Sequence, residues 1–139
     1  MTVLIANHEP PLSDLLRQVL ERRFSKRGPV RFYYCHSVGD VRSVASWIGF
    51  DLFILVVNNV FWEGDEPPDL PRRIGAVVAC IDELKRTYGK PVVAVSGYWA
   101  RGFGYRLEAA GADVVLSLPF ELEVFGDLVA ACLEGLPSD

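Results

Sequence analysis

The sequence predicts an α/β fold in which helices cover both faces of a five-stranded parallel sheet. Short apolar runs alternate with amphipathic segments five times along the 139 residues. Two of these runs, 52–57 and 91–96, are almost entirely apolar, which is typical of strands buried on both faces of a parallel sheet. Half of the residues are apolar, enough for a sizeable core. We therefore expect residues 1–139 to form one domain.

The first half of the chain predicts three strands and two helices. Leucines and Val19 recur at helical spacing after two prolines, so a helix begins there, with Ser13 or a neighbour as its cap. Residues 30–35 are aromatic and β-branched, which favours a strand, and Ser37 is placed to cap the helix that follows. The expected elements are a strand at 3–6, a helix at 12–23, a strand at 30–35, a helix at 38–48 and a strand at 52–57.

The second half continues the same alternation. A stripe of isoleucines, valines and one leucine predicts a third helix, and two glycines weaken the fourth. Gly111 is well placed to end that fourth helix. The expected elements are a helix at 73–88, a strand at 91–96, a helix at 98–110, a strand at 113–117 and a helix at 121–133.

The segment 58–73 is long for a connection between a strand and a helix, where ~2–6 residues is common. It contains Phe61 and Trp62 together with four acidic residues and three prolines. It follows a central strand, at the edge where open α/β sheets bind their ligands. A functional loop and an insertion without a function are both compatible with this pattern.

The charge of the chain argues against binding to nucleic acid. The net charge is −4, whereas a phosphate backbone attracts clustered lysines and arginines. One basic cluster exists, at Arg22, Arg23, Lys26 and Arg27. We expect it to be a solvated helix end whose charge complements the helix dipole.

The cysteines indicate a reducing compartment. Cys35, Cys80 and Cys132 are widely spaced and show no CxxC pair, which fits reduced, buried thiols in the cytosol. The first residues lack the basic and apolar regions of a signal peptide, and no run approaches the ~20 apolar residues of a membrane span. We expect a cytoplasmic protein that does not bind membranes.

Three local patterns resemble the receiver domain of the response-regulator family. VLIANHEPPLSDLL resembles the opening strand and helix of receivers, and FDLFILVV resembles their central strand. PVVAVSGYW followed by GADVVLSLPF resembles the last third. The likeness covers nearly the whole chain. It implies a CheY-like, flavodoxin-like, doubly wound sheet with strand order 2-1-3-4-5.

The resemblance also implies where the phosphoacceptor site falls. Receivers transfer a phosphoryl group onto an aspartate, using two acidic residues that hold Mg²⁺, a lysine and a hydroxyl group. Here the two metal-binding acids fall on Asn7 and His8, and the hydroxyl falls on Ser96. The acceptor falls on Val56 or, after a two-residue shift, on Asn58, and the lysine falls on Leu118. The family's aromatic switch residue falls on Val115.

These neutral replacements predict a degenerate pocket without phosphoryl chemistry. We expect an atypical receiver, or pseudo-receiver, that is not an enzyme, has no catalytic residues and has lost Mg²⁺ binding. It would act in signal transduction of the two-component type by binding protein partners. A homodimer through the fourth helix, fifth strand and fifth helix would follow the habit of the family.

Two other functions stay open. A small-molecule sensor could use an aromatic rim around the degenerate pocket, formed by Phe61, Trp62, Tyr98, Trp99 and Phe103. A conventional phosphoacceptor receiver would need Glu9, Asp51 or Asp65 to take over. Asp51, however, precedes its strand and lies ~16 Å from the site at the rise of a strand.

Two further arrangements give only weak signals. His8, His36 and Cys35 could approach one another at the sheet edge, but they lack the spacing of a metal site and fit polar residues on loop tips better. A serine hydrolase built on Ser96 and His8 would lack both the GxSxG turn and an evident acidic partner.

Overall fold

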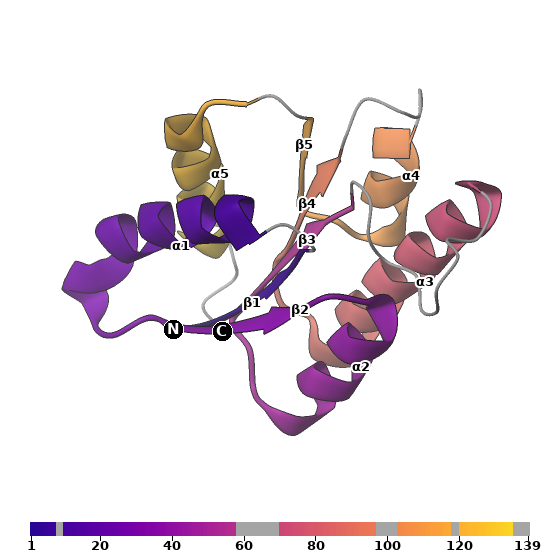
Figure 1. Cartoon of the computed structure of the whole chain (residues 1–139), viewed down its shortest axis with the longest axis horizontal. Helices are drawn as coiled ribbons and strands as arrows, with labels where there is room; N and C mark the ends of the chain where they lie inside the picture. The colour runs from indigo at the N-terminus through magenta and orange to yellow at the C-terminus, as the bar shows by residue number, and fades with distance from the viewer. Residues whose placement is uncertain (8–9, 58–69, 97–102, 118–119, 135–139) are drawn as a thin grey trace.

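The computed structural model describes residues 1–7, 10–57, 70–96, 103–117 and 120–134, without side chains at 10, 70–71, 73–74 and 103. Five parallel strands form one sheet in the order β2-β1-β3-β4-β5. Helices α1 and α5 cover one face, and α2, α3 and α4 cover the other (Figure 1). The predicted fold class and strand order are confirmed.

The elements lie close to their predicted positions. The strands are β1 (Thr2–Ala6), β2 (Arg31–Cys35), β3 (Leu52–Val56), β4 (Val92–Ser96) and β5 (Val114–Ser117). The helices are α1 (Pro10–Phe24), the short 3-10 helix η1 (Ser25–Arg27), α2 (Val38–Trp47), α3 (Leu70–Tyr88), α4 (Phe103–Ala110) and α5 (Leu122–Glu134). No helix in the described part of the chain is both long and apolar enough to cross a membrane.

Two helix starts differ from the sequence prediction for the same reason. Helix α1 begins two residues earlier than predicted, and α3 begins at Leu70, inside the segment 58–73 for which the sequence predicts a loop. Both starts contain prolines, which the first turn of a helix tolerates because its N–H groups have no intrahelical partner. The expected loop is therefore shorter than predicted at its carboxyl end.

Local capping signals are confirmed at two of the three predicted positions. The Ser37 hydroxyl accepts a hydrogen bond from the backbone N–H of Asp40, 3.1 Å away. Gly111 ends α4 with a φ of +119° and donates to the Glu108 carbonyl. Of the prediction that Ser13 or a neighbour caps α1, the Ser13 part is wrong, because Ser13 lies inside the first turn of α1 and its hydroxyl accepts from Asn7 instead.

The core forms two layers, one on each face of the sheet. Every residue of β3 and β4 is buried, as their continuous apolar runs predict. Leu52, Ile54 and Val56 pack toward α1 and α5, while the residues between them pack toward α2 and α3. A row of contacting aromatic rings belongs to the layer on the α2 and α3 side and runs from β2 past β3 to α3. Its members are Tyr33, Phe50, Phe53 and Tyr88.

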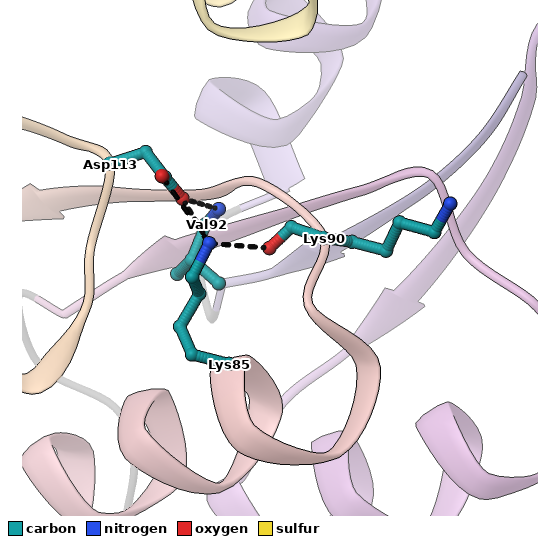
Figure 2. Close-up of polar contacts among 4 residues, drawn as sticks. All are labelled: Lys85, Lys90, Val92 and Asp113. Atoms are coloured by element: carbon teal, nitrogen blue, oxygen red, sulfur yellow. Dashed lines mark hydrogen bonds and ion pairs between the residues drawn. The ribbon is translucent and has the colours of Figure 1, made fainter. Parts of the chain in front are cut away.

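Two aspartates join neighbouring strands at the amino edge of the sheet. Asp51 accepts a hydrogen bond from the Thr2 N–H at 2.8 Å, and its own N–H donates to the Thr2 carbonyl at 2.8 Å. Asp113 forms the same pair of hydrogen bonds with Val92. Its carboxylate also accepts from the Lys85 ammonium, whose Nζ lies 3.0 Å from Oδ2 (Figure 2). Asp51 is therefore a structural residue, remote from the carboxyl edge.

Helices α1 and α5 lie against each other on one face. A methyl group added at Gly126 would meet Val19 Cγ1 at 3.1 Å, so the absence of a side chain allows close packing there. Arg23 pairs with Asp127 at 2.6 Å, and Arg27 pairs with Glu134 at 2.7 Å. The basic cluster is exposed, as predicted, but two of its members pair with α5 rather than only with solvent.

The cysteines are free thiols, as expected. Cys35 and Cys80 are buried, whereas Cys132 is only half-buried, so the prediction of buried thiols is wrong for Cys132. Burial raises the pKa of Cys35 to about 11 and that of Cys80 to about 12. Burial also raises the pKa of Cys132 to about 11. All three thiols are thus protonated at neutral pH.

Candidate functional site

Asn7 follows β1 at the carboxyl edge of the sheet, and its side chain is 4% exposed. Its backbone N–H donates to the Cys35 carbonyl at 3.0 Å, which extends the pairing of β1 with β2 by one residue. Its side-chain Nδ2 donates to the Ser13 hydroxyl, also at 3.0 Å. These contacts hold Asn7 between β1, β2 and the first turn of α1. The sequence did not reveal the contact with Ser13.

Val56 and Ser96 end the two strands that follow β1 across the sheet. Val56 is 1% exposed, pairs in register with Val95 and packs with the core on the α1 and α5 side. Ser96 is 4% exposed and ends β4. The carboxyl edge of the sheet therefore brings Asn7, Val56 and Ser96 to three adjacent strands, as the parallel topology predicts.

These three residues do not fit a Mg²⁺ site. Mg²⁺ requires several oxygen ligands, and carboxylates are the usual protein donors. Val56 offers only hydrocarbon, and the Asn7 amide donates its Nδ2 to Ser13. Across the residues that the structure describes, no three or more His, Cys, Asp and Glu side chains gather to hold a metal ion.

His36 lies beside Asn7, just past β2. Its ring Nδ1 is 3.1 Å from the Asn7 carbonyl oxygen and donates to it in the tautomer with hydrogen on Nδ1. The Cys35 side chain packs in the core layer beneath α2, and its protonated thiol is a poor metal ligand. His36 thus has a structural contact of its own, and the weak prediction of a metal site gains no support from it.

A small hollow of about 180 Å³ opens next to Asn7. Its lining residues are Asn7, Ser13, Asp14, Tyr34 and His36. Burial raises the pKa of the Tyr34 phenol, while the nearby Arg17 lowers it. The residues around the hollow carry polar groups, but the surface that they expose to it is mostly apolar. The hollow is also smaller than the ~300 Å³ of ordinary small-molecule sites.

Several predicted site residues lie outside the described residues. They are His8, Asn58 and Leu118 of the phosphoacceptor pocket and Phe61, Trp62, Tyr98 and Trp99 of the aromatic rim. Phe103 of the rim opens α4, but its side chain is not described. Glu9 and Asp65 also lie outside.

No family model and no curated protein matches the sequence. Solved structures do match. A two-component response regulator from Clostridium difficile shares 16% identity over 96% of each chain, with a TM-score of 0.73. An orphan response regulator from H. pylori shares 14% identity over 96% of each chain, with a TM-score of 0.71. The chain has the receiver-domain fold.

A further structure with the receiver fold covers both chains completely. It is an atypical orphan response regulator described as having a phosphorylation-independent regulatory mechanism, with 14% identity, 100% coverage of each chain and a TM-score of 0.72. Because the identities are this low, these comparisons establish only that the fold is shared. The fold is the part of the resemblance that the structure confirms.

The receiver fold places α4, β5 and α5 along one side of the molecule (Figure 1). Tyr105 on α4 is 80% exposed, and Val124 on α5 is 41% exposed. Between them, Val115 on β5 is half-buried, and its Cγ1 lies 3.6 Å from where a Cβ on Gly104 would stand. Val115 therefore packs beneath α4 as a compact aliphatic side chain.

Proposed function

We propose that the chain is an atypical receiver of the response-regulator family that signals through protein contacts without phosphorylation on an aspartate. The observation that carries this proposal is the chemistry at the carboxyl edge. Asn7 directly follows β1, while Val56 ends β3 and Ser96 ends β4. These three strands are adjacent, and none of the three residues has a carboxylate.

The chemistry of phosphoryl transfer explains why these residues matter. The acceptor must be a nucleophilic carboxylate, and the charge of the incoming phosphoryl group must be neutralised by a metal ion and a cationic side chain. A valine side chain has no nucleophile, and the amide of Asn7 carries no charge to attract Mg²⁺. We accordingly propose that the protein is not an enzyme and has no metal cofactor.

The absence of an aromatic residue at Val115 supports the same proposal. In the family that the sequence resembles, an aromatic side chain at this place changes rotamer when the acceptor is phosphorylated. Val115 has a short, branched side chain packed beneath α4, which leaves no ring to move. A receiver of this kind would present one constitutive surface to its partners.

The proposed contact surface is the face formed by α4, β5 and α5, which can also serve a homodimer. Tyr105 and Val124 supply exposed aromatic and aliphatic area on this face. Receiver domains generally work as non-enzymatic modules that bind other proteins, and the atypical orphan regulator with the same fold is described as phosphorylation-independent. Exposed aromatic residues commonly anchor such contacts.

The test is incubation with acetyl phosphate and Mg²⁺ followed by intact-mass spectrometry. A conventional receiver treated in parallel serves as the positive control. We expect no mass increase on this chain. A phosphoryl adduct that hydroxylamine removes would reveal an acyl phosphate and would overturn the proposal.

The hollow beside Asn7 favours a second candidate function, a sensor of a small molecule. Its volume of about 180 Å³ admits only a small molecule, and its polar groups come from Asn7, Ser13, Asp14, Tyr34 and His36. A thermal-shift screen of small metabolites should then find a stabiliser whose effect disappears in His36→Ala. If no compound stabilises the protein, this second candidate fails and the first stands.

A further inference from the structure

The strand β2 is one of the two outer strands of the sheet and pairs with β1 alone (Figure 1). Among the described elements, no strand lies on its other side, which we call the open side of β2. Three of its five residues are exposed, namely Arg31, Tyr33 and Tyr34. At the other end of the sheet, β5 has one exposed residue among its four. The open side of β2 is therefore the more accessible of the two outer sides.

The hydrogen bonds to β1 show where the backbone groups of β2 point. The Arg31 N–H donates to the Met1 carbonyl at 2.9 Å. At the far end of the strand, the Cys35 carbonyl accepts from the Asn7 N–H at 3.0 Å. Both ends of β2 thus direct backbone groups to β1. Because these groups alternate sides along a strand in a parallel pair, those of Tyr33 point to β1 as well.

Phe32 and Tyr34 therefore direct their N–H and C=O groups to the open side. In the described part of the chain, no further strand accepts or donates there. Outer strands are commonly protected from further pairing by lysine, by proline or by a bulge. The three middle residues of β2 are Phe32, Tyr33 and Tyr34, and they pair with β1 in unbroken register. The open side of β2 is thus able to accept another strand.

We propose that the open side of β2 pairs with β2 of a second copy of this chain, antiparallel, across a two-fold axis at Tyr33. In this register Phe32 of each copy forms a hydrogen-bonded pair with Tyr34 of the second copy. These two pairs use every outward N–H and C=O group of both residues. The two Tyr33 residues meet on the axis as a non-hydrogen-bonded pair, with their Cα atoms ~4.5 Å apart.

The side chains of β2 are complementary to themselves in this register. Arg31, the one charged residue of the strand, lies opposite the uncharged Cys35 of the second copy. On the α1 side of the sheet, Phe32 meets Tyr34, and aromatic pairs across antiparallel strands are stabilising. A shift of one residue would set outward groups against groups already bonded to β1. The pattern therefore selects one register.

A second copy fits the open side better than a charged extended peptide. A basic peptide would be repelled by Arg31, and the charges of an acidic peptide would mostly lie against the aromatic side chains of β2. An isologous contact avoids both conflicts, because the same uncharged strand centre is used twice. The two copies would then share one sheet of ten strands, in which neither β2 is an outer strand.

The short length of β2 predicts a weak dimer. Five residues at ~3.3 Å each span about 17 Å, and such a strand offers far less than the ~800 Å² that each partner buries in a standard stable interface. We therefore expect a dimer that dissociates on dilution. Because β2 and β5 lie at opposite ends of the strand order, this dimer leaves Tyr105 and the α4, β5 and α5 face available for another protein.

Opposite charges at position 33 test the two-fold axis. Sedimentation velocity over a dilution series from about 1 mM downward should show a monomer–dimer equilibrium for the wild type. Tyr33→Lys alone and Tyr33→Glu alone should each weaken the dimer by at least about tenfold, because like charges then meet on the axis. An equimolar mixture should dimerise more tightly than either variant, because the introduced lysine then faces the introduced glutamate.

The mixture also separates this effect from a loss of folding. Both variants lose the same edge-on ring contact between Tyr33 and Phe50, so damage to the monomer would persist on mixing. Tyr105→Lys and Tyr105→Glu are the matched controls on α4, at the other end of the sheet. Neither should weaken the dimer, and mixing them should change nothing.

Amide hydrogen exchange followed by NMR tests the backbone pairing itself. The Phe32 and Tyr34 amides should exchange more slowly as the protein concentration rises, whereas the Tyr33 amide, which bonds to β1, should not change. Tyr34→Pro removes an outward N–H without removing a bond to β1, so it should abolish the dimer and leave the monomer folded.

Three outcomes overturn the proposal: a wild type that stays monomeric at every concentration, a dimer that the Tyr33 variants do not weaken, and a mixture no tighter than its components. The first would leave the open side of β2 to a strand from a different protein. None of these outcomes bears on phosphorylation, which the acetyl phosphate experiment tests separately.

Discussion

Asp113 and Val92 exchange two hydrogen bonds at the amino edge of the sheet, each 2.8 Å long. Figure 2 shows the one that the Asp113 side chain accepts. The Asp113 carboxylate accepts from the first N–H of β4, and the Asp113 N–H donates back to the Val92 carbonyl. Lys85 reaches the same carboxylate from α3 and also donates to the Lys90 carbonyl at 3.3 Å. One aspartate thereby joins β4, β5 and α3.

Removing this carboxylate should destabilise the protein. Asp113→Ala leaves a partly buried N–H without its acceptor, and we expect the free energy of unfolding to fall by about 1–3 kcal/mol. Asp113→Asn keeps an acceptor oxygen and loses mainly a partly exposed ion pair, so its effect should stay below about 1 kcal/mol. Urea unfolding measures both. Equal losses in the two variants would contradict the assignment of the effect to the Val92 hydrogen bond.

Gly111 should resist substitution more than Gly89 does. Both have positive φ, +119° and +64°, but a Cβ at Gly111 would stand 2.7 Å from Lys85 Cγ, whereas a Cβ at Gly89 meets nothing within 4 Å. We expect Gly89→Ala to lower stability by about 1 kcal/mol through backbone strain alone and Gly111→Ala by about 2 kcal/mol or more. Thermal unfolding of the two variants compares them directly. The reverse order would mean that Lys85 moves aside without a penalty.

Asn7 and Ser13 should be energetically coupled. Their hydrogen bond is buried, so Asn7→Ala and Ser13→Ala should each destabilise the protein, and the double variant should lose less than the sum. We expect a coupling energy of about 0.5–1.5 kcal/mol from a double-mutant cycle in urea. A cycle with Ser37 in place of Ser13 is the control and should show additive effects, because Ser37 caps α2 through Asp40. Coupling near zero for Asn7 and Ser13 would contradict the contact.

Stability should fall as the pH rises above about 9, the ordinary pKa of a free thiol. The thiols have a pKa near 9.0 when unfolded, whereas burial raises the pKa of Cys80 to about 12 and that of Cys35 to about 11. Between these values the unfolded chain loses protons that the folded chain retains, so the equilibrium shifts toward unfolding. Urea midpoints measured from about pH 8 to 11 should decline, and Cys80→Ala should decline less steeply. Identical slopes would show that Cys80 does not contribute.

The features that sequence predicted best are those set by local chemistry. The continuous apolar runs of β3 and β4, the cap at Ser37 and the glycine stop at Gly111 all depend on a few neighbouring residues. Parallel topology then brings Asn7, Val56 and Ser96 to one edge without further information. The features that sequence missed depend on how elements meet.

Ser13 illustrates the difference. As an isolated signal it favours a helix cap, but the prolines before it allow α1 to begin earlier, and its hydroxyl then faces Asn7. The pairing of Arg23 and Arg27 with α5 joins residues more than a hundred positions apart, which no local pattern encodes. Cys132 is a second example. Cysteine is a residue type that is usually buried, but this one, on α5, is only half-buried.

The placement of Asp51 and Asp113 has an evolutionary consequence. Both aspartates hydrogen-bond to neighbouring strands at the edge of the sheet opposite Asn7, Val56 and Ser96. The two carboxylates that hold these strands together are therefore separate from the side chains at the carboxyl edge. A lineage can therefore exchange acids for neutral residues at the carboxyl edge, one position at a time, without losing the anchors that set strand register. The register of the strands is therefore set independently of the side chains that occupy the carboxyl edge.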